Sequence, residues 1–245
     1  MSVAGKLEKL KSILSSAGSA VIALSGGTDS TFLLSVAAGL PGLRVMAVTV
    51  STPYMFSSEV DEAAQFCRDI GVHHRLVEFD IPETVRENPP ERCYFCKTRV
   101  MKSITAVAVE EGYAFVFDGT NADDLLDYRP GLKALEEAGV RSPLAEARLA
   151  KEEIRALARA AGLAVSDRPA NACLLTRFPH DTQITATDLR RAEKAEQIVR
   201  NEGFTGARVR VHGEIARLEI WNEHFELIAR QETRTRIASA LKELG

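Results

Sequence analysis

Short runs of β-branched and other apolar residues alternate, from Ser19 to Ala161, with longer stretches in which apolar residues recur every three to four positions. This alternation is typical of a parallel sheet covered by helices. The predicted strands are Ala20–Leu24, Arg44–Val50, His74–Glu78 and Phe115–Phe117. The predicted helices are Ser30–Ala38, Ser57–Ile70, Lys97–Glu111 and Lys151–Ala161. The fold class is therefore α/β, with a doubly wound parallel sheet.

The pattern changes after Pro169, where a turn-rich stretch leads into a long amphipathic segment, Asp188–Asn201. Two alternating stretches, Arg208–His212 and Ile215–Ile220, then flank a glycine turn and predict a hairpin, and a last helix is expected at Glu232–Leu244. We expect a small α+β appendage. The predicted domains are residues 1–178 and 179–245.

Composition narrows the functional classes. The 245 residues include 45% hydrophobic and 27% charged residues, the ordinary balance of a soluble protein with a core. No apolar run approaches the roughly 20 residues that cross a bilayer, so no membrane partner is expected. A net charge of −3 gives no basic field, so a nucleic acid is not expected either. The residues Met1–Lys11 lack the pattern of a secretory signal, which favours a cytoplasmic protein whose cysteines serve metal or redox chemistry.

The segment Ser25-Gly26-Gly27-Thr28-Asp29-Ser30 lies between the first predicted strand and the next helix. Adjacent glycines let the backbone approach an anion, and free N–H groups at a helix start favour phosphate. Ser25 and Ser30 can add hydroxyl donors, and Asp29 can hold the Mg²⁺ that bridges nucleotide phosphates. A tight turn with a capped helix is the simpler alternative.

This segment lacks the lysine of a Walker loop, and it closely resembles the Ser-Gly-Gly-x-Asp-Ser signature of the PP-loop ATP pyrophosphatases. Those enzymes cleave ATP between its α and β phosphates to make an adenylate. The resemblance implies nucleotide contacts at Thr49 and Ser51, which end the second strand. It also implies contacts at Gly119 and Asn121, after the later strand. Both pairs lie at carboxyl ends of strands, where open α/β sheets bind ligands, although each would otherwise be an ordinary loop.

Three cysteines form a second candidate site. Cys93 and Cys96 lie two residues apart beside Arg92 and Lys97, whose charges favour thiolates, and Cys173 can join them only through folding. Three thiolates without a fourth suggest a 4Fe-4S cluster with one open iron, or zinc completed by histidine or water. A thioredoxin-like redox pair fits less well. The fourth cysteine, Cys67, lies on an apolar helix face and is expected to be a core residue.

Nearly the whole chain resembles the LarE family of ATP-dependent sulfur transferases, which help to mature the nickel-pincer cofactor of lactate racemase. The segments that carry the resemblance are Ser25–Ser30, Gly119–Asp124, Arg129–Gly131, Ser142–Leu144, Ala172–Leu174 with Arg177, and Arg208–Gly213. Some members keep only the counterpart of Cys173 and sacrifice its sulfur. The presence of Cys93 and Cys96 resembles the members that bind a 4Fe-4S cluster through three cysteines and turn over repeatedly with a cluster-bound hydrosulfide.

The resemblance also implies further roles. The substrate would be a nicotinate-derived mononucleotide whose phosphate binds Arg177, Arg208 and Arg210, although the last two also suit the solvated face of a strand. Glu196 approximates an acidic metal-contacting position, for which Glu193 competes. Sulfide, or a sulfur donor such as a cysteine desulfurase, would supply sulfur, and a homo-oligomer is expected.

Three other functions stay open. Some PP-loop proteins with three cysteines and a 4Fe-4S cluster thiolate tRNA, which requires a grip on a polyanion. Synthetases of the GMP or NAD kind use ammonia on the adenylate and do not need the cysteines. A zinc-stabilised nucleotide-binding regulator would have no turnover.

Overall fold

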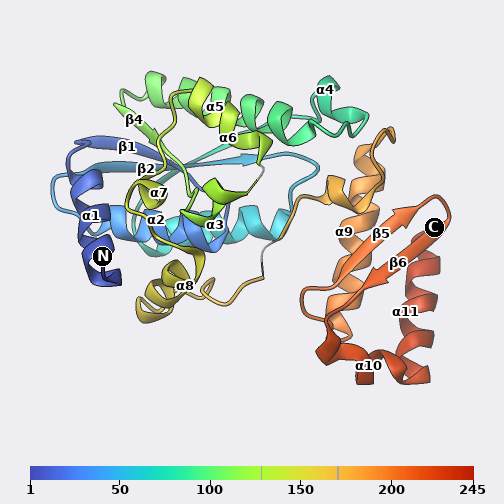
Figure 1. The fold of residues 1–245 in the computed structure, drawn as a ribbon. Coiled ribbons are helices and arrows are strands. Elements are labelled where there is room, and N and C mark those ends of the chain that lie inside the picture. Colours follow the sequence, from blue (N-terminus) through green and yellow to red (C-terminus); the bar gives the residue numbers. More distant parts are fainter. Residues whose placement is uncertain (128, 170) are drawn as a thin grey trace. The chain divides into compact units, whose positions relative to one another are not determined.

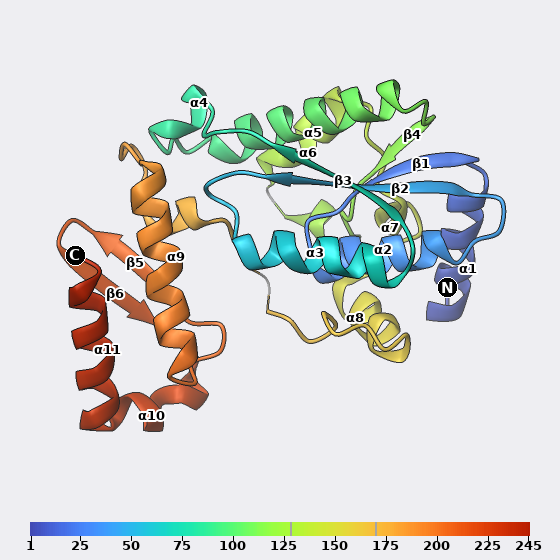
Figure 2. The ribbon, with the colours of Figure 1, turned by 180° about the vertical axis from the view of Figure 1, so that it is seen from behind.

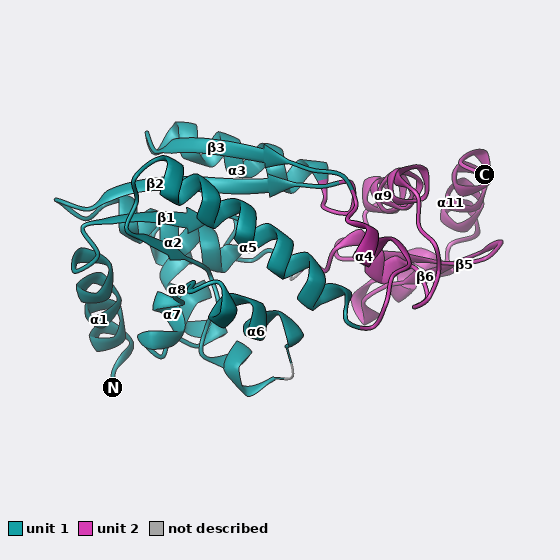
Figure 3. Ribbon diagram, turned by 90° about the horizontal axis from the view of Figure 1, so that it is seen from above, with its two compact units in different colours: residues 1–52, 57–80, 91–170 teal, residues 53–56, 81–90, 171–245 magenta. Residues whose placement is uncertain are grey.

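The computed structural model describes residues 1–127, 129–169 and 171–245 and divides the chain into two compact units (Figure 3). Unit 1 comprises residues 1–52, 57–80 and 91–170, and unit 2 comprises residues 53–56, 81–90 and 171–245. Residues 171–178, which the sequence analysis assigned to the first domain, belong to unit 2. No helix in the described ranges combines the length and apolar character needed to cross a membrane.

Unit 1 is built on a parallel sheet of four strands in the order β3-β2-β1-β4. The strands are β1 (Ser19–Ala23), β2 (Arg44–Ser51), β3 (His73–Glu78) and β4 (Phe115–Phe117). The central residues Ala20, Val21 and Ile22 of β1 are fully buried, as expected for a strand covered on both faces. The outer strand β3 contains exposed and half-buried residues and no fully buried one. The predicted strands and fold class are confirmed.

Helices cover both faces of this sheet (Figures 1 and 2). Helices α2 (Thr28–Ala38) and α3 (Ser57–Asp69) lie on one face, together with α1 (Val3–Ser15) and α8 (Lys151–Ala160). Helices α5 (Arg92–Glu110) and α6 (Pro130–Glu137) lie on the other. Alternate residues of β1 and β2 point to the first face, where Ile22 and Ala47 join one core with Leu33 of α2 and Cys67 of α3. The short elements η1 (Asp123–Leu126) and α7 (Pro143–Glu146) complete unit 1.

The start of α5 differs from the prediction. The sequence pattern placed it at Lys97, whereas the helix begins at Arg92 and so includes both Cys93 and Cys96 in its first two turns. Its N-cap residue Glu91 makes no side-chain capping bond, so no local signal marks the start. The first turn is supported instead by tertiary contacts, including the bond from Tyr94 Oη to Glu137 Oε2 of α6 at 2.7 Å.

Unit 2 contains the antiparallel hairpin of β5 (Arg208–His212) and β6 (Ile215–Glu219), as predicted. Helix α9 (Ala186–Asn201) begins with a capping box in which Thr185 and Asp188 bond each other's backbone N–H groups. The hairpin packs on α9 and α11 (Gln231–Glu243) around Val199, Phe204 and Val209. The remaining short elements are α4 (Glu83–Arg86), η2 (Leu174–Arg177), η3 (Asn222–His224) and α10 (Phe225–Ala229).

Two short segments from earlier in the chain complete unit 2. The Leu174 amide donates to the Tyr54 carbonyl at 2.9 Å, and the Ile184 amide donates to the Arg86 carbonyl at 2.9 Å. The buried Asn88 side chain donates to the carbonyl oxygens of Leu175, Phe178 and Pro179. These bonds explain why residues 171–178 cluster with unit 2.

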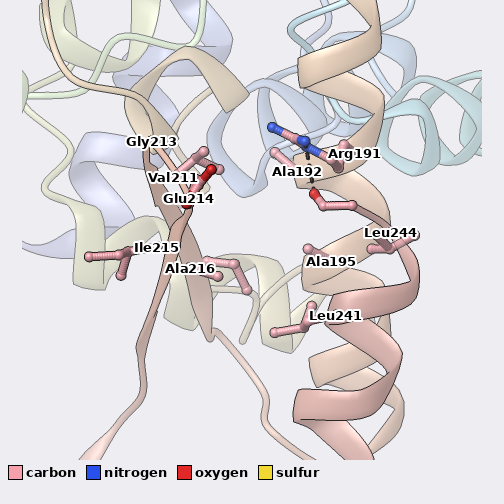
Figure 4. Close-up of a pocket in the computed structure, with 12 residues that line it drawn as sticks. Arg191, Ala192, Ala195, Val211, Gly213, Glu214, Ile215, Ala216, Leu241 and Leu244 are labelled. Atoms are coloured by element: carbon pink, nitrogen blue, oxygen red, sulfur yellow. Dashed lines mark hydrogen bonds between the residues drawn. The ribbon is translucent and has the colours of Figure 1, made fainter.

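Unit 2 also holds an apolar pocket of about 470 Å³ between α9, the hairpin and α11 (Figure 4). Three alanines, Ala192, Ala195 and Ala216, leave space that larger side chains would fill. At the rim, Arg191 donates from Nη1 to the Gly245 carbonyl at 2.8 Å. The pocket is therefore apolar inside, with Arg191 and Glu214 on its lining.

Candidate nucleotide and cysteine site

The phosphate loop follows β1 and requires glycine at its second position. Gly26 has φ +77°, and a Cβ atom there would lie 2.6 Å from the Glu59 carbonyl oxygen. The two serine hydroxyls of the loop, Ser25 Oγ and Ser30 Oγ, lie 3.1 Å apart and brace the turn. Gly27 is the N-cap of α2 and has no side chain to satisfy the first N–H groups of the helix. Those groups and the helix dipole are available to an anion.

The loop after β4 lies directly against this turn. A Cβ atom on Gly119 would lie 2.8 Å from the backbone nitrogen of Ser30, so only glycine allows the two backbones to approach so closely. The next loop residues reach the start of α2, since Asn121 Nδ2 lies 3.4 Å from Asp29 Oδ2. Gly119 and Asn121 are distant from Ser25–Ser30 in the sequence, and the fold brings them into contact with the phosphate loop.

Asp29 has two differently satisfied oxygens. Its Oδ2 accepts from Lys151 Nζ at 2.7 Å, whereas its buried Oδ1 has no hydrogen-bond partner among the described residues. Burial raises the pKa of Asp29 and the nearby Asp124 carboxylate adds to this, while Lys151 and Asn121 oppose it. A buried carboxylate oxygen without a donor is costly unless a cation or water completes it. The site therefore fits the predicted Mg²⁺, which takes oxygen ligands.

Two parts of this cluster were not predicted from the sequence. Lys151, the first residue of α8, contacts Asp29, and its backbone N–H donates to Asp123 Oδ2 at 2.8 Å. Asp124 Oδ2 accepts from the Asn121 backbone at 3.0 Å, and its other oxygen pairs with Arg129 at 2.7 Å. The Asp123 and Asp124 positions lay in a segment of family resemblance, but no local pattern singles out Lys151.

Thr49 and Ser51 lie near the end of β2. Thr49 is buried, its hydroxyl donates to the Leu24 carbonyl at 2.9 Å, and His74 Nε2 lies 2.8 Å from the same oxygen. Its hydroxyl proton is therefore used inside the sheet. Ser51 is half-buried at the last position of the strand. A nucleotide contact at these two residues stays a prediction.

Two of the three predicted cysteine ligands share a helix start. Cys93 and Cys96, separated by two residues, lie at positions i and i+3 in the first two turns of α5, so they are neighbours on one helix face. Cys93 is exposed and Cys96 is half-buried. Because α5 leads through its C-terminus into the parallel strand β4, its N-terminus lies at the carboxyl edge of the sheet, as the phosphate loop does.

A buried carboxylate connects this helix to the same edge. Asp118, which follows β4, accepts from Lys97 Nζ at 3.3 Å and from Ser142 Oγ at 2.7 Å. It also accepts from the Thr120 hydroxyl at 2.7 Å. Lys97, the residue directly after Cys96, is thereby bonded to the loop that carries Gly119 and Asn121.

The third predicted ligand, Cys173, is half-buried in unit 2 and directly precedes η2. None of the four cysteines, all of which the structure describes, is in a disulfide. Across the described ranges, no group of three or more His, Cys, Asp or Glu side chains is arranged to hold a metal ion. A shared cluster on Cys93, Cys96 and Cys173 stays a prediction. Cys67 is fully buried, and burial raises the pKa of its thiol to about 11, as expected for a core residue.

Arg177 and Glu196 form a buried ion pair. Arg177 Nε and Nη2 donate to the two carboxylate oxygens of Glu196 at 2.7 and 2.9 Å. Its other N–H groups reach the Ala172 carbonyl, the Thr176 hydroxyl and Asn171 Oδ1. All five donors of the guanidinium are thus in use. Phosphate binding by Arg177 stays a prediction, and it requires this network to open.

The carboxylate oxygens of Glu196 also have partners, since Oε1 accepts from the Val209 backbone N–H at 3.0 Å in addition to Arg177. A metal contact by Glu196 stays a prediction, and Glu193 is half-buried one turn away on α9.

The two arginines of β5 have partners within unit 2. Arg210 donates to Glu219 at 2.7 Å and to the Thr176 carbonyl at 2.6 Å. Arg208 lies opposite Glu219 in the backbone register of the hairpin, and its side chain is half-buried. Their role toward substrate phosphate also stays a prediction.

Comparisons with known proteins show which families and proteins the chain resembles. The family model for asparagine synthase matches residues 10–202. An uncharacterized protein of Synechocystis is 39% identical over 223 residues, which cover 90% of this chain and 83% of that protein. The pyridinium-3,5-bisthiocarboxylic acid mononucleotide synthase of Lactiplantibacillus plantarum is 35% identical over 202 residues, covering 81% of this chain and 73% of that enzyme.

A solved structure shares the fold. The U34-tRNA thiolase NcsA from Methanococcus maripaludis, solved with its 4Fe-4S cluster, superposes with a TM-score of 0.52 and 19% identity. The match covers 80% of this chain and 74% of that one. At this identity, the likeness supports the common architecture.

Proposed function

Since the chain belongs to the asparagine synthase family, and within it to the LarE group of PP-loop enzymes, we propose that it is an ATP-dependent sulfur transferase. The substrate would be a nicotinate-derived mononucleotide with a carboxylate on its pyridinium ring, and the product a thiocarboxylate. The relative from Lactiplantibacillus plantarum, named as a synthase of a bisthiocarboxylic acid mononucleotide, supports this substrate class. The reaction would belong to the synthesis of a nickel-pincer cofactor.

The reaction has two steps, adenylation of the carboxylate and transfer of sulfur. A carboxylate oxygen attacks the α-phosphorus of ATP, the bond to the β-phosphate oxygen breaks, and pyrophosphate leaves, which gives an acyl adenylate. Hydrosulfide then attacks the acyl carbon and displaces AMP, leaving the thiocarboxylate and releasing the hydrosulfide proton. Adenylation is needed because a carboxylate is a poor electrophile, and AMP is a much better leaving group than oxide.

The phosphate loop serves the first step. The N–H groups at the start of α2 and the ammonium of Lys151 would stabilise the negative charge that accumulates on pyrophosphate. Asp29 Oδ1, which has no partner in the described ranges, would ligate the Mg²⁺ of Mg·ATP while Oδ2 keeps Lys151. This oxygen, held beside the loop and next to a lysine, is the observation that carries the proposal.

The cysteines serve the second step. Cys93 and Cys96, adjacent on the first turns of α5, would ligate a metal centre together with Cys173. When bound, a 4Fe-4S cluster with one open iron supplies a hydrosulfide nucleophile.

The proposal is tested with protein purified without oxygen. Iron and sulfide content and visible absorption distinguish a 4Fe-4S cluster from zinc and from an unmetallated protein. The protein is then incubated with Mg·ATP, sulfide and the carboxylate mononucleotide. Pyrophosphate, AMP and a product in which sulfur replaces oxygen are expected in equal amounts. Absence of pyrophosphate formation with every carboxylate tested would leave a binding protein without turnover.

Cysteine variants separate the competing reactions. We expect Cys93→Ala, Cys96→Ala and Cys173→Ala to keep pyrophosphate formation and to lose the thiocarboxylate, whereas the core variant Cys67→Ala keeps both. Amide formation from ammonia in all four variants would identify a synthetase of the GMP or NAD kind. Thiolation of tRNA, with salt-sensitive tRNA binding, would identify the tRNA enzyme instead.

We further propose that the protein works in the cytoplasm as a homo-oligomer and receives sulfur as sulfide or from a donor such as a cysteine desulfurase. Gel filtration with light scattering measures the assembly. Activity with a cysteine desulfurase and cysteine in place of sulfide tests the donor.

A further inference from the structure

A hydrogen-bonded chain crosses three strands of unit 1 just below the phosphate loop. Leu24 is the last residue before Ser25, and its amide donates to the Val48 carbonyl of β2 at 2.9 Å. Its carbonyl accepts from Thr49 Oγ1 at 2.9 Å. The same hydroxyl lies 2.8 Å from Nε2 of His74 on β3. Both backbone groups of the residue that enters the loop are therefore bonded to β2 and its side chains.

The directions of these bonds follow from counting protons. A carbonyl oxygen only accepts, so the single hydroxyl proton of Thr49 belongs to the Leu24 bond. His74 must then donate from Nε2, which assigns the proton of the neutral ring to that nitrogen. Burial lowers the pKa of His74, and the charges of Arg68 on α3 and of His73 add to this, which favours the neutral ring. The neutral ring has the single proton that the chain needs.

The chain matters because the residue it holds leads straight into the turn that binds phosphate. Thr49 is only 2% exposed, so water does not compete well for its hydroxyl. Without the donor from His74, the hydroxyl could rotate and release the Leu24 carbonyl. A shift of a few tenths of an ångström would then pass to Ser25 and Gly26, where phosphate is held by backbone geometry.

We propose that His74 is a positioning residue for the phosphate loop, acting through the Thr49 hydroxyl on the Leu24 carbonyl. Its kinetic consequence rests on the proposed ATP cleavage, whereas its effect on the loop does not. His74 is not expected to touch the nucleotide.

The first test measures amide hydrogen exchange of residues 24–30 in ligand-free protein. His74→Leu and Thr49→Val remove the donor and the hydroxyl, and each should raise exchange in this segment roughly tenfold. His74→Gln places an amide N–H near the position of Nε2, and Thr49→Ser keeps the hydroxyl. Both should stay within about threefold of the wild type. Equal exchange in Thr49→Val and Thr49→Ser overturns the proposal, even if His74→Leu does not fold.

The second test is a double-mutant cycle on pyrophosphate release. Because the loop holds the leaving group, each disruptive variant should lower kcat about tenfold and change KM for ATP less than threefold. The double variant should be no worse than Thr49→Val alone, since His74 acts through that hydroxyl. Additive losses, or failure of His74→Gln to restore kcat, contradict the assignment. If the wild type releases no pyrophosphate, the proposed function fails, and the exchange experiment still decides the role of His74.

Discussion

The ammonium nitrogen of Lys151 lies 2.7 Å from Oδ2 of Asp29, although 122 residues separate the two in the chain. The second oxygen of the same carboxylate is buried and has no partner in the described ranges. One carboxylate thus holds a protein cation on one side and is open to a second cation on the other. The arrangement allows Mg²⁺ to bind without displacing Lys151, so that two positive charges act on the phosphates together.

Replacement of Asp29 by asparagine should leave the protein at least as stable as the wild type at neutral pH, while Mg·ATP binding is lost. Burial raises the folded-state pKa of Asp29 above 3.8, so its ionisation is less favourable in the folded state. This cost is absent well below pH 3.8, grows as the pH rises through the folded pKa, and persists above it. Urea unfolding at several pH values measures it. A wild type more stable than Asp29→Asn at neutral pH would show that the Lys151 pair outweighs burial.

Lys151→Met should lower kcat for pyrophosphate release on the order of 100-fold, because it removes a cation beside the leaving group. Lys133→Met is the matched control, since Lys133 is exposed and pairs with Glu137 at 3.8 Å. Pyrophosphate release under saturating Mg·ATP measures both. Equal rates in the two variants would assign Lys151 a structural role only.

Gly26→Ala should destabilise the protein by about 3 kcal/mol or more and abolish nucleotide binding, because the new methyl group would meet the Glu59 carbonyl at 2.6 Å. Gly139→Ala isolates the backbone strain, since Gly139 has φ +66° and a Cβ atom there meets nothing within 4 Å. It should cost only about 1 kcal/mol. Thermal unfolding and calorimetric titration with Mg·ATP give both quantities. Similar losses in the two variants would mean that strain, rather than the collision, dominates.

Glu196→Gln should lower the free energy of unfolding by roughly 3 kcal/mol, because it leaves the Arg177 charge buried with only neutral partners. Both side chains are at most 2% exposed, so solvent cannot compensate. Glu202→Gln is the control, since its partner Arg236 is largely exposed and solvent screens the pair, so the stability should change little. Urea unfolding compares them. An unchanged stability with a raised KM for the mononucleotide would instead favour direct substrate contact.

Alkylation of the metal-free protein should modify Cys93 first and leave Cys67 unmodified. Cys93 is exposed at a helix start, whereas burial raises the pKa of Cys67 to about 11. At pH 8 roughly one Cys67 thiol in a thousand is then the reactive thiolate, and it is also shielded. Peptide mass spectrometry after timed iodoacetamide treatment gives the order. Early labelling of Cys67 would show that α3 opens readily.

Several features could be predicted from the sequence because their causes are local. The strands of unit 1 and the hairpin of unit 2 follow from apolar periodicity, which reports directly on burial. The phosphate loop follows from two glycines between a strand and a helix, since Gly26 allows the positive φ of the turn and Gly27 leaves the first N–H groups of the helix without a side-chain cap. The family resemblance depended on these same short segments, and the comparisons confirm it.

Other features depended on contacts between distant residues. No local pattern predicts that Lys151 contacts Asp29 or that α5 begins at Arg92. Nor does any local pattern predict that Arg177 donates to Glu196. Hydrogen bonds and ion pairs between such residues form only after the elements pack, and burial then decides which polar groups remain open to a ligand. The sequence by itself determined the elements and the phosphate loop. The tertiary structure decided which charged groups lie at the phosphate loop, because ion pairing depends on distance in space and not on separation along the chain.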